Sequence, residues 1–191
     1  MQRLVRHAVG LGLLFWIVSA NNAVAIPGDI IRNVEAWIQS HPTLRPAPGE
    51  RLIINRAETP ARRFTFQATP FPVVGSVADM EMNGTIRTEK ITLVDTVDGI
   101  SGNRLEEALR AIYDAVIYND YRRATVVYRY PNGDIFADDA GRMQRGELRE
   151  GDRFAYWMNL TTTPEGFTPR GTLTVFLKED IAALQADLQN R

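Results

Sequence analysis

The stretch 101–130 constrains the fold most, because a strong helical pattern leads directly into a strand. Its first part repeats apolar residues at the three- and four-residue spacing of one helix face, namely Leu105, Leu109, Ile112 and Val116. Asn103 and Glu106 have the spacing of a capping box, in which each side chain accepts a backbone N–H at the helix start. The sequence therefore predicts a long helix over residues 103–121.

Two-residue apolar alternation replaces the helical spacing after this segment. Val126, Tyr128 and Tyr130 share one face of a predicted strand, and Asn132-Gly133 favours a hairpin back through Ile135 and Phe136. The segment 153–161 alternates in the same way. It places Trp157 on one face and four apolar residues on the other: Phe154, Tyr156, Met158 and Leu160.

The first 25 residues have the pattern of a cleavable signal peptide. Arg3 and Arg6 precede an apolar run that is short for a bilayer span, and Ala23-Val24-Ala25 matches the small-x-small cleavage site. An uncleaved membrane anchor is the alternative. With cleavage, we expect no stable membrane span and an exported protein, in the periplasm or outside the cell, or in the thylakoid lumen of a photosynthetic source.

Residues 26–191 have the length of one domain. Apolar patterns also predict a short N-terminal helix over 27–42 and a closing helix over 178–190, and runs of strands separate the three helices. This order predicts an α+β fold in which an antiparallel sheet packs on, or curls around, a long central helix.

Charge and composition exclude several classes of function. The formal net charge is −1, and the first 25 residues carry two arginines and no acid, so the remainder is acidic and nucleic acid is not an expected partner. There is no cysteine, and His41 is the one histidine beyond the signal segment. Zinc and haem patterns cannot be built from one histidine and no cysteine, so we expect no metal and no cofactor. A Ser-His-Asp site is not expected either, because His41 precedes a proline at a predicted helix end.

Aromatic side chains concentrate in the second half of the chain, where they suit a pocket rim or a partner surface. A local arginine series beginning at residue 142 is largely balanced by neighbouring acids. The candidate ligand or partner contacts are Tyr113, Tyr121, Tyr128, Tyr130, Tyr156, Trp157, Arg142 and Arg145.

These observations favour a non-enzymatic, exported module that binds or assists another envelope protein. One alternative is a binder of a small apolar ligand, with a tyrosine-rimmed pocket. Another is a carboxylate-dependent hydrolase, for which the adjacent acids Glu106-Glu107 and Asp138-Asp139 are candidates. The sequence leaves these alternatives open.

Overall fold

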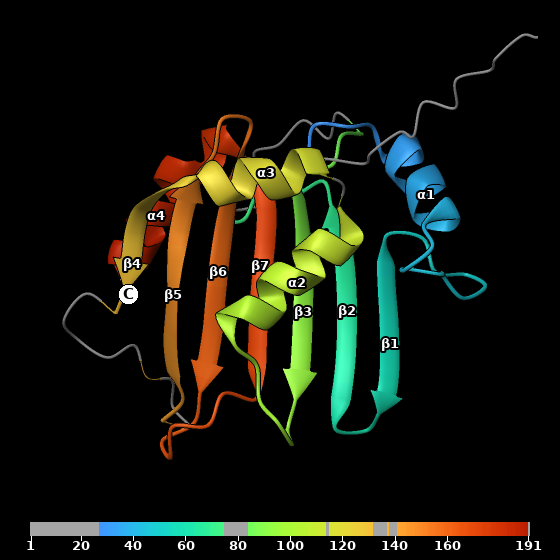
Figure 1. Cartoon of the computed structure of the whole chain (residues 1–191). Helices are drawn as coiled ribbons and strands as arrows, with labels where there is room; N and C mark the ends of the chain where they lie inside the picture. Colours follow the sequence, from blue (N-terminus) through green and yellow to red (C-terminus); the bar gives the residue numbers. More distant parts are fainter. Residues whose placement is uncertain (1–26, 75–83, 114, 132–136, 138–140, 191) are drawn as a thin grey trace, which may run out of the picture.

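A computed structural model describes residues 27–74, 84–113, 115–131, 137 and 141–190 of the chain. Seven strands form one sheet in the order β1-β2-β3-β7-β6-β5-β4, and all neighbouring strands run antiparallel (Figure 1). The strands are β1 (Ile53–Thr59), β2 (Arg62–Thr69), β3 (Thr88–Asp95), β4 (Thr125–Tyr130), β5 (Met143–Glu150), β6 (Phe154–Thr162) and β7 (Arg170–Leu177).

The last strand occupies the centre of the sheet. β1 to β3 form one antiparallel series and β4 to β7 another, and β7 pairs with β3 to join them. Ile91 of β3, for example, lies opposite Phe66 of β2 and Leu173 of β7. All three side chains are buried in one core.

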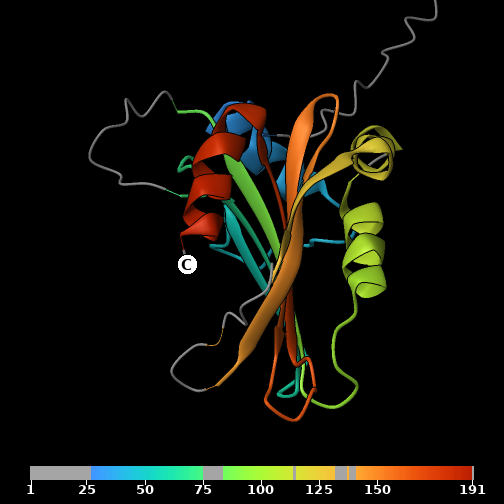
Figure 2. The same cartoon turned by 90° about the vertical axis from the view of Figure 1, so that its left-hand side faces the viewer.

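Helices cover both faces of the sheet. α2 (Gly102–Ile112) and α3 (Ala115–Arg123) cross one face, and α4 (Ile181–Gln189) lies on the other (Figure 2). α1 (Ile31–Ser40) contributes Val34 and Ile38 to the core beneath α2. None of the helices in the described ranges combines the length and apolar composition that a bilayer crossing requires.

The predicted long central helix is wrong. α2 has 11 residues and ends at Ile112, where Tyr113 adopts extended backbone (φ −101°, ψ 157°), and the separate α3 begins at Ala115. The start also differs, because Ser101 rather than Asn103 accepts a backbone N–H from Arg104. The sheet therefore packs against short helices on both faces instead of curling around a long one.

The helices at the two ends are shorter than predicted. α1 covers residues 31–40 of the predicted 27–42. A 3₁₀ turn (Lys178–Asp180) precedes α4 within the predicted 178–190. The predicted hairpin turn through Asn132 and Phe136 lies outside the described residues.

The alternation predicted along β6 is confirmed. Phe154, Tyr156, Met158 and Leu160 belong to the core beneath α2 and α3. Trp157 packs instead with Leu184 and Leu188 of α4. A two-residue period therefore identified the two faces of this strand correctly.

Candidate functional site

The loop between β3 and α2 is organised by Asp95, the last residue of β3. Its Oδ1 accepts the backbone N–H groups of Val97 at 3.0 Å and Asp98 at 2.9 Å. An aspartate commonly forms such a turn with the backbone two residues on. Gly99 then adopts a positive φ of 76°, which glycine tolerates without steric cost, and the chain enters α2 at Ser101.

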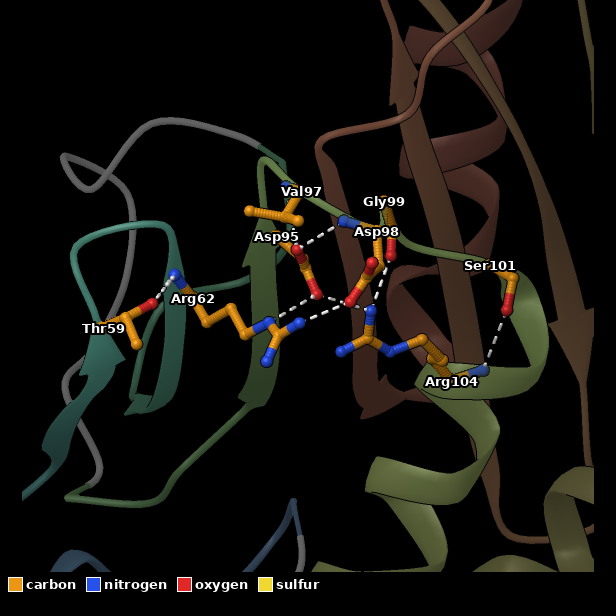
Figure 3. A network of polar contacts seen from close by, with 8 residues as sticks. All are labelled: Thr59, Arg62, Asp95, Val97, Asp98, Gly99, Ser101 and Arg104. Atoms are coloured by element: carbon orange, nitrogen blue, oxygen red, sulfur yellow. Dashed lines mark hydrogen bonds and ion pairs between the residues drawn. The ribbon is translucent and has the colours of Figure 1, made fainter.

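Two arginines from different elements converge on the same carboxylate (Figure 3). Arg104 of α2 donates to Asp95 Oδ2 at 2.8 Å and to the Gly99 carbonyl at 2.6 Å. Arg62 of β2 lies 3.4 Å from the same oxygen and also pairs with Asp98. The Asp98 N–H and the Arg104 guanidinium are the main causes that hold the pKa of Asp95 well below its usual range.

Two hollows meet at Arg104. The larger has a volume of about 330 Å³ and is lined by Asp98, Gly99, Ile100, Ser101, Arg104, Gly166, Phe167 and Thr168. The smaller, of about 150 Å³, is lined by Arg56, Glu58, Arg62, Arg63, Phe64, Leu93, Val94, Ile100 and Arg104. Arg104 is therefore accessible from two sides, and 43% of its side chain is exposed.

Two apolar side chains are exposed on the loops at this end of the sheet, and Phe167 lines the larger hollow. Val97 is 63% exposed and Phe167, in the loop between β6 and β7, is 37% exposed. The two loops are held together, because the Ile100 N–H donates to the Thr168 carbonyl at 2.7 Å. A Cβ at Gly99 would lie 3.1 Å from the Phe167 ring, so the ring rests directly on this glycine. We call residues 95–104 and 163–168 the loop edge.

Three of the predicted contact residues lie on the face covered by α2 and α3, and each hydroxyl donates to a carboxylate. Tyr113 donates to Glu89 at 2.5 Å, Tyr121 to Glu106 at 3.0 Å and Tyr156 to Asp120 at 2.7 Å. Tyr121 and Tyr156 also meet edge to face, with ring centroids 5.3 Å apart. These tyrosines are buried in the core.

The other predicted aromatic residues lie on the opposite face, with α4. Trp157 Nε1 donates to the Tyr130 hydroxyl at 2.7 Å, and the rings of Tyr128 and Tyr130 stack with centroids 6.2 Å apart. The six aromatic residues therefore form two groups on opposite faces of the sheet.

Arg142 and Arg145 lie before and within β5, and both are exposed. Neither lines the two hollows at Arg104. Asp138 and Asp139, the acids considered for hydrolysis, lie outside the described residues. Glu106 accepts the Tyr121 hydroxyl, and Glu107 is exposed on α2.

Asp120 is a second carboxylate that organises a turn, and sequence reasoning missed it together with Asp95. It is only 2% exposed, and its oxygens accept the backbone N–H groups of Asp152, Arg153 and Phe154 as well as the Tyr156 hydroxyl. The Asp-x-x-Asp-Gly spacing at Asp95 could have indicated the first turn. Asp120 has no comparable local signal, because its partners are more than 30 residues away.

No family model, curated protein or solved structure matches this chain. Within the described ranges, no group of three or more histidines and acids could hold a metal ion.

Proposed function

We propose that the protein is an exported, non-catalytic binding module that engages a partner protein through the loop edge. The observation that supports this most is that exposed Phe167 and the accessible guanidinium of Arg104 line one hollow, while Val97 is exposed on the loop that precedes it. Aromatic and arginine side chains at the centre of an interface carry a large share of its binding energy. Export rests on the signal pattern of the first 25 residues.

The hydrogen bonds of Asp95 and Asp120 support a non-catalytic role for these two acids. Asp95 and Asp120 each accept several hydrogen bonds, which fixes them as structural acceptors. A lowered pKa keeps Asp95 ionised at neutral pH, where it has no proton to donate. The division of the aromatic residues between two faces gives no support to a pocket rimmed by all of them.

Site-specific photo-crosslinking tests this proposal. A photoreactive phenylalanine analogue placed at Val97 or at Phe167 should yield an adduct of the same mass in the source's envelope extract. Val116 on α3 is the control position, because it is 48% exposed and lies outside the loop edge. Equal adducts from position 116, or none from the other two, would contradict the assignment of the surface.

A matched pair of arginine variants tests the role of the guanidinium. Arg104→Ala should reduce the yield of the adduct at least tenfold, as expected for an arginine at the centre of an interface. Arg110→Ala changes an exposed arginine six residues further along the same helix and should leave the yield unchanged. Unfolding midpoints of both variants establish that the loss does not come from unfolding.

A further inference from the structure

Glu89 is a fully buried carboxylate in the middle of the sheet. It lies on β3, between Ala68 of β2 and Val175 of β7. Its Oε2 accepts the hydroxyl of Tyr113 at 2.5 Å, whereas Oε1 is buried and has no hydrogen-bond partner. An ionised carboxylate with an unsatisfied oxygen is costly in such an environment.

The group that covers Glu89 is Tyr113, at the end of α2. Tyr113 occupies the break between α2 and α3, where its extended backbone interrupts the helix. Trp37 of α1 stacks on the Tyr113 ring, with centroids 6.0 Å apart and planes at 17°. β3 is hydrogen-bonded on both sides, so Tyr113 can move away from Glu89 with less disruption than β3 can.

We propose that Tyr113 covers Glu89 in a proton-linked manner, and that this cover is closed while Glu89 carries a proton and opens when Glu89 loses it. Opening gives the carboxylate access to water and separates Tyr113 from Glu89. This inference is independent of the partner-binding role, because it concerns the opposite end of α2 from the loop edge.

The pH range follows from the environment of Glu89. Burial is the main cause that raises its pKa to about 7, the Tyr113 hydrogen bond opposes this, and the charge of Asp29 adds to it. The closed state therefore binds the proton more tightly than the open state does. Closure is fully favoured below the ordinary value of 4.5, is lost progressively as pH rises through about 7, and levels off above that pH.

Other titratable groups also lie close to Ile112 and Tyr113. His41 hydrogen-bonds the Ile112 carbonyl at 2.8 Å, and burial lowers its pKa. Tyr156 interacts with Tyr113 from β6, and the pKa of both hydroxyls is raised, so neither ionises in this range. A test must therefore retain these groups and change Glu89 alone.

Hydrogen exchange of the full chain and of Glu89→Gln, measured by mass spectrometry between pH 4.5 and 8.5, tests this proposal. The glutamine has the shape of the protonated acid and cannot ionise, and comparison at each pH cancels the intrinsic exchange rates and any effect of His41. We expect peptides from 105–123 to exchange at similar rates in both proteins at pH 4.5. By pH 7 the wild-type chain should exchange about 30-fold faster or more, and the difference should level off above that pH.

Peptides from β6 provide the internal control. The ratio of their exchange rates in the two proteins should stay constant with pH. A ratio for 105–123 that does not change with pH would overturn the proposal. An equal rise in the exchange rate of β6 peptides would also overturn it, because the sheet would then open together with residues 105–123. If Glu89→Gln does not fold, the wild-type chain alone provides the test. The exchange rate of peptides from 105–123, divided by that of peptides from β6 and corrected for intrinsic rates, must then show the same rise with pH.

Discussion

Asp95 and Asp120 both use one carboxylate to hold a turn, but their partners differ. Asp120 accepts three backbone N–H groups from the turn between β5 and β6 and one tyrosine hydroxyl. Asp95 accepts two backbone N–H groups from its own loop and is flanked by Arg104 and Arg62. The first connects segments distant in the chain, and the second connects a loop to charged groups at the surface.

The difference separates a structural role from a binding role. Asp120 is itself buried and is engaged by the β5–β6 turn and by Tyr156, so this carboxylate stabilises α3 against β6 and offers nothing to another molecule. The arginines at Asp95 remain 39% and 43% exposed. Asp95 therefore fixes their positions while leaving guanidinium donors accessible to a partner.

The largest expected effect is that of Asp120→Asn on stability. The amide keeps the shape of the carboxylate but turns N–H groups toward N–H donors, which leaves several buried groups unsatisfied. We expect a loss of about 3 kcal/mol in the free energy of unfolding, measured by urea denaturation. Asp152→Asn, at an exposed position, should change stability by less than about 0.5 kcal/mol. Equal losses of stability in the two variants would contradict the structural role of Asp120.

Removal of one partner of Asp120 should have an intermediate effect. Tyr156→Phe deletes the hydroxyl that donates to Asp120 and retains the ring in the core. The expected loss is about 1.5 kcal/mol, again from urea denaturation. Tyr118→Phe on α3 is the control, because its ring is partly buried against the same core. A larger loss of stability from Tyr118→Phe would contradict the role of the Tyr156–Asp120 hydrogen bond.

Asp95→Asn should lower Tm less, by roughly 3 °C, because part of its network is solvated. The pKa of Asp95 is lowered, so its stabilisation is complete above its ordinary value of 3.8 and decreases as pH falls below it. Thermal scans from pH 2 to 7 should show a shallower acid dependence for the variant. A parallel dependence in both proteins would show that Asp95 does not contribute in this range.

The smallest expected effect is that of salt on the two aspartate variants. In 1 M NaCl the difference in Tm caused by Asp95→Asn should fall by about half, because salt screens exposed charge pairs more than buried ones. The difference caused by Asp120→Asn should not change. Differential scanning fluorimetry at low and high salt measures both differences. Equal salt dependence in the two variants would contradict the greater exposure of the charge pairs at Asp95.

Local patterns predicted the strands more successfully than the helices. β6 was identified with both of its faces, since a two-residue period determines which side chains share a core. The helix break was missed because the spacing of Leu109, Ile112 and Val116 suits one continuous helix. Beyond Tyr113 the buried face shifts to Ile117 and Tyr121, and Val116 becomes exposed. The contact of Tyr113 with Glu89, 24 residues away, accompanies this shift and has no local signal.

The candidate site was predictable only in part. Asp95, Asp98 and Gly99 form a recognisable turn, and Ser101 is a good helix N-cap. The approach of Arg62 and Phe167 depends on the order of strands, which brings segments from both halves of the chain to one end of the sheet. Sequence periodicity specifies the face of a strand but not its neighbours.

The central position of β7 has a consequence for how this chain is made. β3 and β6 each lack one neighbour until residues 170–177 have been synthesised, so the two halves cannot form a continuous sheet earlier. Until then, two long edges with buried-type residues are open to pairing with other chains. A chain truncated before Arg170 should therefore aggregate rather than fold into a smaller sheet. Formation of the complete sheet is necessarily a late step, dependent on the final strand.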